Sequence, residues 1–267
     1  MRRFGNAAAW AYLAAALVFI FLPVVMLVLY SFQDGLAPVP PFTGPSLRWW
    51  AKVLDNRKLI DALWNSLAVG LGSSLVATAL GFLAAYALAR KQRPLNNIFQ
   101  YALMAPITVS YLIIGMGLQI TFNLMGIDKS LLAVGIGHVV INLPLTFAII
   151  YSQLGEHQAN IERAAYDLGA RDWQVILLVT APMLWPTLLA AFFIAATLSW
   201  DEFVIAFLLS RFDVTLPVVI WSMLRSGMSP ELNAAGTLVF IISVVAVIAV
   251  ELLLWRGRRS EGQISNG

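Results

Sequence analysis

Six long apolar segments, separated by shorter polar stretches, dominate the pattern of hydrophobic and polar positions along this chain. They cover residues 7–31, 62–90, 97–123, 130–152, 183–209 and 234–255. A helix that crosses a bilayer needs about 20 predominantly apolar residues, and each segment is long enough. The pattern therefore predicts an all-α integral membrane protein, in which residues 1–267 form one domain with six transmembrane helices.

The second segment carries small residues at a helical spacing. Two rows repeat every four positions, namely Ser66, Gly70, Ser74 and Thr78, and Ala77, Gly81, Ala85 and Ala89. Small side chains allow the backbones of two helices to approach closely in lipid. We therefore expect this helix to pack tightly against a neighbour.

The longest polar interruption is the central loop, residues 153–182. Apolar residues at positions 161, 164, 165 and 168 predict one face of a short amphipathic helix. Asn160 is a suitable N-cap for that helix, and Gly169 can end it in a left-handed turn. Asp172 is a suitable N-cap for a second helix that leads back into the apolar sequence. A loop of two helices joined at a glycine can dock into a groove on a soluble partner.

Outside the six segments, two further stretches have helical character. Ser46 can cap a helix whose apolar face includes Trp49 and Trp50, and tryptophan is typical of a lipid boundary. The loop 211–233 contains an apolar piece at 216–224. This piece predicts a short helix that lies at the membrane surface or re-enters the protein.

Composition agrees with a membrane protein and excludes several kinds of site. The chain is 60% hydrophobic and 12% charged, whereas a soluble domain has about a quarter charged residues. It has no cysteine, and its two histidines, His138 and His157, lie in different segments. We therefore expect no disulfide and no metal site. The net charge of +3 gives no reason to expect a nucleic-acid partner.

The basic residues predict the orientation. With six spans, both termini lie on the same side as the central loop, and 10 of the 17 Lys and Arg residues fall on that side against 7 on the other. The bias is stronger in the short turns and tails, which weigh most in the positive-inside rule. We therefore expect the termini and the central loop to be cytoplasmic.

Two adjacent acids, Asp201 and Glu202, follow Trp200 inside the fifth apolar segment. An ionised acid near the bilayer centre costs at least ~2.5 kcal/mol, so such residues usually face a protein interior or a wet cavity. Neighbouring helix positions point about 100° apart, so one acid can face a cavity while the other meets a neighbouring helix. Carboxylates attract cations, and Trp200 adds a cation–π face, which favours an ammonium substrate. The alternative is a solvated or salt-bridged pair near the outer end of the helix.

The central loop also resembles the EAA loop of ABC-importer permeases. Ala164, Ala165, Gly169 and Pro182 match that motif, while Arg163 stands where the motif has glutamate and Glu162 lies one position earlier. Together with LSWDEFVIAFLLS and SGMSPELNA, the loop resembles the permeases of spermidine/putrescine importers.

This resemblance implies a type I ABC importer permease fold in a bacterial inner membrane. It implies that a second permease completes the pathway, that two ATP-binding subunits hold ATP and Mg²⁺, and that a soluble protein delivers the substrate. It assigns contact with the ATPase subunits to Glu162, Arg163, Ala164, Ala165, Gly169 and Pro182, and the substrate pathway to Trp200, Asp201 and Glu202.

Other functions remain open on the sequence. Related permeases carry other small solutes, and a stand-alone secondary transporter or channel could use the acids as an ion site. The chain has no G-x-x-x-x-G-K-[ST] phosphate loop, so we expect no ATP hydrolysis, no cofactor and no enzyme activity of its own. An intramembrane enzyme would need a base beside its nucleophile, and the sequence pairs His138 with no serine.

Overall fold

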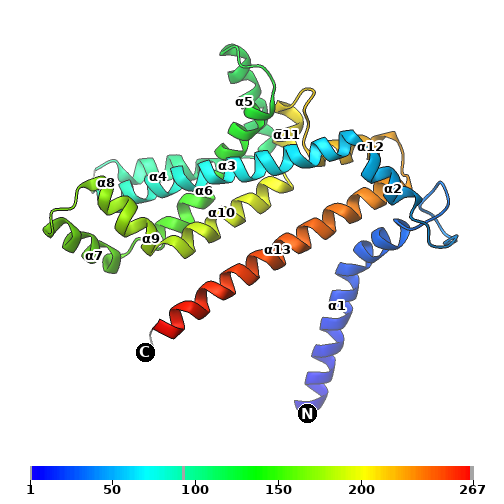
Figure 1. Cartoon of the computed structure of the whole chain (residues 1–267), viewed down its shortest axis with the longest axis horizontal. Helices are drawn as coiled ribbons and strands as arrows, with labels where there is room; N and C mark the ends of the chain where they lie inside the picture. The colour runs from blue at the N-terminus through cyan, green and yellow to red at the C-terminus, as the bar shows by residue number, and fades with distance from the viewer. Residues whose placement is uncertain (1, 92–93, 265–267) are drawn as a thin grey trace. The chain divides into compact units, whose positions relative to one another are not determined.

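The chain is helical throughout its described part. The computed structural model describes the backbone of residues 2–91 and 94–264, and the side chains of residues 9–91 and 94–248. Every regular element within those residues is a helix (Figure 1). The chain divides into two compact units, Met1–Ile60 with Val219–Gly267, and Asp61–Val218. The residues that the sequence assigns to ATPase coupling and to the substrate pathway all lie in the second unit.

The first unit combines both ends of the chain. It contains α1 (Arg2–Tyr30), α2 (Arg48–Asp55) and α13 (Pro230–Ile264), and both α1 and α2 contact α13. The expected helix at the two tryptophans is therefore present as α2, with Trp49 and Val53 buried. Lys52 of α2 forms an ion pair of 2.5 Å with Glu231 of α13.

The second unit contains the remaining helices and most of α3. They are α3 (Arg57–Arg90), α4 (Asn96–Met104), η1 (Ala105–Thr108), α5 (Tyr111–Leu124), α6 (Leu131–Tyr151), α7 (Glu156–Asp167), α8 (Asp172–Gln174), the π-helix η2 (Val175–Thr180), α9 (Ala181–Met183), α10 (Trp185–Trp200) and α11 (Val204–Leu209). The expected short helix at 216–224 is α12 (Leu216–Ser226), which crosses the boundary between the units.

Sharp bends occur in the third expected helix and at the start of the fifth. By length and composition, four helices within the described residues could each cross a membrane. The third segment is a helix pair, 96–108 with 111–124, bent by 108°, and a second pair, 172–183 with 185–200, bent by 76°, joins the end of the central loop to the fifth segment. Pro106 lies in the first turn of η1, where α4 ends, and the bend itself follows at residues 109–110. Pro182 and Pro186 flank the second bend. Proline has no N–H for the helical ladder and clashes with the preceding turn, which explains why α4 and α9 end close to these prolines.

The predicted fifth helix, 183–209, is wrong as one continuous helix. The α10 helix ends at Trp200, residues 201–203 are not helical, and α11 starts again at Val204. The other expected segments correspond to α1, α3, α6 and α13, with ends that differ by up to nine residues. Six crossings within a single domain remain a prediction.

In the second unit, α3 packs closely against α6. All four residues of the row that begins at Ser66 are buried, as are Ala77, Gly81 and Ala85 of the second row. The hydroxyl of Thr146 on α6 donates a 2.9 Å hydrogen bond to the carbonyl oxygen of Ala77. A Cβ at Gly81 would lie 2.6 Å from Thr146 Oγ1 and 2.9 Å from the backbone nitrogen of Phe147. The expectation of tight packing is confirmed, because the two backbones leave no room for a side chain at Gly81.

We predict that Gly81→Ala destabilises the protein by about 1–3 kcal/mol, the usual cost of adding a methyl group to a filled interface. Gly72, on the same helix, provides the control, because a Cβ there would have no atom within 4 Å. Gly72→Ala should be neutral or slightly stabilising, because alanine favours a helix over glycine by about 1 kcal/mol. Thermal unfolding of the two purified variants in detergent measures the difference, and equal melting temperatures would contradict the close approach.

Candidate functional site

The first half of the central loop is α7 (Glu156–Asp167), which begins five residues before its expected start. Its N-cap is Gly155, so the expected cap at Asn160 is wrong. Asn160 instead lies within the helix, where its side-chain oxygen accepts a hydrogen bond of 3.1 Å from Arg163. The earlier start follows from Glu156, because an acid in the first turn is favourable at the positive end of the helix dipole.

Gly169 ends α7 in the left-handed turn that the sequence predicts. Its φ is +86°, and its N–H donates to the carbonyl of Tyr166 at 2.9 Å. The N–H of Ala170 donates to the carbonyl of Ala165 at 3.1 Å. These two bonds form a Schellman motif, which satisfies carbonyls at the end of the helix.

The second half of the loop begins at Asp172, which is the first helical residue. The expected N-cap at this aspartate is therefore one position off, because Arg171 is the cap. The side-chain oxygen of Gln174 accepts from the N–H of Arg171 at 2.8 Å, which satisfies the capping residue. From here α8, η2 and α9 lead to the 76° bend and α10, so the loop connects directly to the helix before the two acids (Figure 1).

The apolar face of this loop is exposed. Ile161 and Ala164 of α7 are exposed, Leu168 is 90% exposed, and Trp173 of α8 is 54% exposed. Arg163 and Pro182 are also exposed, and Ala165 is half-buried. A helix that presents such a face at a glycine turn is suited to a hydrophobic groove on another protein.

Glu162 differs from the other residues that the sequence placed at the ATPase contact. It is 3% exposed, and its carboxylate accepts hydrogen bonds from Arg90 and Thr180. Its carboxylate therefore does not belong to the exposed face, and its role in coupling to the ATPase subunits stays a prediction. The sequence analysis gives Arg90 no role, because nothing in the local pattern indicates its pairing with a residue 72 positions away.

The two acids lie at the break between α10 and α11 and have different environments. Asp201 is the C-cap of α10 and is exposed, whereas Glu202 is 6% exposed. The Glu202 carboxylate accepts from the backbone N–H groups of Val204, Ile205 and Ala206 at 2.9, 2.9 and 3.2 Å. It thus stabilises the first turn of α11, where the helix dipole also favours a negative charge.

His138 is the hydrogen-bonded interior group on α6 beside these acids. Its Nδ1 lies 2.5 Å from Ser199 Oγ, which lies 3.2 Å from Ser73 Oγ on α3. His138 Nε2 lies 3.5 Å from Glu202 Oε2, which is too long for a hydrogen bond, so the contact is electrostatic at most. These polar side chains join α3, α6 and α10 near the start of α11.

The sequence gave no sign that His138 meets a serine, and a Ser–His–Glu set raises the question of nucleophilic catalysis. The exposed fractions of Ser199, His138 and Glu202 are 4%, 1% and 6%, and the Glu202 carboxylate is occupied by α11. A nucleophile must reach its substrate, and the aspartate or glutamate of a triad must hold the histidine. The arrangement therefore fits a structural role.

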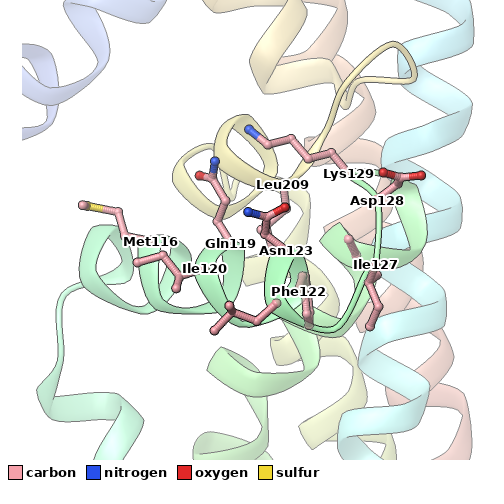
Figure 2. Close-up of a pocket in the computed structure, with 11 residues that line it drawn as sticks. Met116, Gln119, Ile120, Phe122, Asn123, Ile127, Asp128, Lys129 and Leu209 are labelled. Carbon is pink, nitrogen blue, oxygen red and sulfur yellow. The ribbon is translucent and has the colours of Figure 1, made fainter.

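A cavity of about 510 Å³ opens elsewhere, between the end of α5 and the turn before α6 (Figure 2). Gln119 and Asn123 of α5 line it together with Lys129 of the turn, which extends toward Gln119 in the view. None of the residues from Trp200 to Glu202 lines this cavity. Among the described residues, no group of three His, Cys, Asp or Glu side chains could hold a metal ion.

The comparisons with known proteins define the class. Residues 77–256 match the family described as "Binding-protein-dependent transport system inner membrane component", and the chain belongs to this family. It is therefore a permease component of an ABC importer and a multi-pass protein of the inner membrane, and a stand-alone transporter or channel is not favoured.

Two curated relatives cover most of the chain. The putrescine transport system permease protein PotI of Escherichia coli (strain K12) is 32% identical over 244 residues, which are 88% of this chain and 86% of that protein. The spermidine/putrescine transport system permease protein PotC of the same strain is 28% identical over 247 residues, which are 91% of this chain and 92% of that protein.

Solved structures confirm the type I permease fold. A chain of a bacterial ABC transporter involved in the import of the acidic polysaccharide alginate matches with a TM-score of 0.68 and 18% identity, over 96% of each chain. A chain of the alginate transporter in complex with its alginate pentasaccharide-bound periplasmic protein matches with a TM-score of 0.69 and 17% identity, over 94% of this chain and 92% of that one.

We predict that Glu202→Ala lowers the stability of the protein by about 1–2 kcal/mol, the usual cost of losing a helix N-cap. Glu202→Gln should cost less, because the amide keeps one acceptor oxygen. The exposed neighbour provides the control, since Asp201→Ala should change stability by less than about 0.5 kcal/mol. Thermal unfolding of the three variants checks this, and equal effects of the two alanine substitutions would contradict the cap.

Proposed function

We propose that this chain is the permease subunit of a polyamine importer that carries substrates such as spermidine or putrescine. Its membership of the permease family and the names of its relatives support this substrate class. A second permease completes the pathway. A soluble binding protein delivers the substrate outside, and two ATP-binding subunits hold ATP and Mg²⁺, so this chain needs no cofactor.

The exposed acid at the end of α10 supports a cationic substrate. Asp201 is exposed, and the described residues supply no hydrogen bond or ion pair for its carboxylate. A carboxylate at the wall of a low-dielectric pathway attracts ammonium groups, and the half-buried Trp200 beside it adds an aromatic face. The buried Glu202 adds negative charge next to Asp201, and its hydrogen bonds to the backbone stabilise the first turn of α11.

The exposed face of the central loop carries the coupling to ATP. Ile161, Ala164, Leu168 and Trp173 would enter a groove on an ATP-binding subunit, with Arg163 and Pro182 at its edge. The termini and this loop lie on the cytoplasmic side, where ATP is available. Burial of these side chains against the ATP-binding subunit would supply the affinity between the two proteins. Ile161, Leu168 and Trp173 are large apolar side chains that are exposed to water in this otherwise polar loop.

The connection between this face and Asp201 supports an alternating-access mechanism. In the second unit, α7 and α8 lie at one end, and α10 runs from the bend beside them toward α11 (Figure 1). Closure of the ATP-binding subunits on ATP would displace α7, and the bend at Pro182 and Pro186 would turn that displacement into a tilt of α10. The tilt would open the outer side of the pathway, and hydrolysis would reverse it.

The observation that carries the proposal is the exposed apolar face of α7 and α8 on either side of the Gly169 turn. One bent helix pair joins this face to the exposed Asp201. We predict that Gly169→Ser reduces copurification of the ATP-binding subunit about tenfold. A residue other than glycine in the left-handed region costs about 1–2 kcal/mol, which is enough for that change. Quantitative pull-down of the assembled complex measures it.

The same substitution at Gly155 provides the control. Gly155 has a φ of −83° at the N-cap of α7, where serine is favourable, so Gly155→Ser should retain the ATP-binding subunit. Normal copurification and normal uptake with Gly169→Ser would reject the proposed docking face.

We predict that Asp201→Asn raises the KM for putrescine uptake about tenfold, as the loss of about 1.4 kcal/mol of binding free energy would. The reason is that the amide keeps the size of the side chain but removes the charge. Asp213→Asn, at another exposed aspartate, should leave the KM unchanged. Uptake of labelled putrescine and spermidine by the whole complex in liposomes measures both, and an unchanged KM with Asp201→Asn would reject the cation site.

A further inference from the structure

The coupling helix α7 is joined to its neighbours along the chain by two deformable connections. Before it, residues 152–155 form a turn that ends at Gly155, and after it comes the left-handed turn at Gly169. A force applied to α7 through these two connections alone would be absorbed by rotation at the glycines. Transmission therefore requires a direct contact between the middle of α7 and the helices of the membrane part.

Three side chains make that contact at the middle of α7, and near the end of the helix the hydroxyl of Tyr166 also lies 3.4 Å from that of Tyr86 on α3. Arg90 Nε donates to Glu162 Oε2 at 2.6 Å, and Arg90 Nη2 donates to Glu162 Oε1 at 3.2 Å. Thr180 Oγ1 donates to Glu162 Oε1 at 2.9 Å. The three residues come from the last position of α3, the middle of α7 and the end of η2, and are called the coupling clasp below.

The chemistry of the clasp makes it a rigid connection. Two parallel N–H···O bonds between a guanidinium and a carboxylate restrict both distance and orientation, which a single lysine ammonium would not do. The Arg90 side chain is 16% exposed and Glu162 is 3% exposed, so solvent screens the pair little. Arg90 also donates to the carbonyl of Leu154 at 3.4 Å, which ties the turn before α7 to the same guanidinium.

Two series of contacts connect the coupling clasp to the end of α10 that precedes Asp201. One is the bent pair from η2 through α9 to α10. The other is α3, along which Arg90 and Ser73 are separated by roughly 25 Å at 1.5 Å per residue. Ser73 contacts Ser199, which contacts His138, so a displacement of α3 reaches the histidine that lies 3.5 Å from Glu202.

We infer that Arg90 and Glu162, with Thr180, are positioning residues that transmit the displacement of α7 to α3 and α10, and that Glu162 does not bind the ATP-binding subunit. This inference rests on the proposed coupling function of the loop. It differs from docking, because the clasp lies beneath the exposed face and acts after the partner has bound.

The test separates docking from transmission in the complete importer reconstituted in liposomes. For each variant we would measure copurification of the ATP-binding subunit, ATP hydrolysis and the amount of putrescine imported per ATP hydrolysed. Arg90→Ala and the near-isosteric Glu162→Gln should retain the ATP-binding subunit. They should lower the import per ATP about tenfold, a change typical of the energetic coupling between two sites.

Three further variants make the result specific. Arg90→Lys keeps the charge but loses the paired donors and should remain defective, whereas the exchange Arg90→Glu with Glu162→Arg should restore part of the ratio. Thr180→Val removes one donor and should give an intermediate ratio. Lys91→Ala, at the exposed position next to Arg90, should match the unmodified chain.

A wild-type ratio of import to ATP hydrolysis in Glu162→Gln and Arg90→Ala would overturn the inference. Loss of the ATP-binding subunit in Glu162→Gln would also overturn it, because the carboxylate would then serve docking. Failure of the unmodified chain to retain an ATP-binding subunit would instead contradict the proposed function on which the inference rests.

Discussion

The main constraint on this chain is that a backbone in an apolar surrounding must satisfy its polar groups without water. Unbroken helices do so by themselves, but every break exposes N–H and C=O groups that need other partners. At the break after α10 the partner is a carboxylate, since Glu202 accepts from three N–H groups of α11. At the turn that ends α7, which is exposed to solvent, the partners are local, because the turn at Gly169 returns two N–H groups to the carbonyls of α7. The chain can therefore bend where its function needs a bend.

Close packing of small residues makes the second unit stiff enough for a local displacement to travel. Gly81 lets α3 touch the backbone of α6, and Gly115 and Gly137 let α11 lie against α5 and α6, since a Cβ there would come within 2.6 Å of Leu208 or 2.5 Å of Ile205. Densely packed helices respond to a force by shifting between discrete arrangements more readily than by deforming continuously. Rigid helices joined at a few defined bends suit a protein that converts closure of a soluble partner into movement within the membrane.

The two buried acids show how similar residues acquire different roles from their partners. Glu162 forms an ion pair with Arg90 and connects three elements, while Glu202 serves one helix and lies near His138. A buried carboxylate without partners would be costly, so its hydrogen bonds indicate what each acid does. Asp201 has no comparable internal task among the described residues, which is why the substrate hypothesis rests on it.

The sequence by itself determined the helical class, the small-residue face of α3 and the glycine turn that ends α7, because periodicity and backbone preferences act between near neighbours. Only the tertiary structure decided that α10 stops before Asp201, that Glu202 caps α11 and that Glu162 turns inward. Those outcomes depend on contacts such as Arg90 with Glu162, 72 positions apart, and His138 with Ser199, 61 positions apart. Local preference cannot choose between an exposed and a buried carboxylate. The choice depends on which distant side chains fold against it, because a charge is stable in a buried place only where donors are supplied.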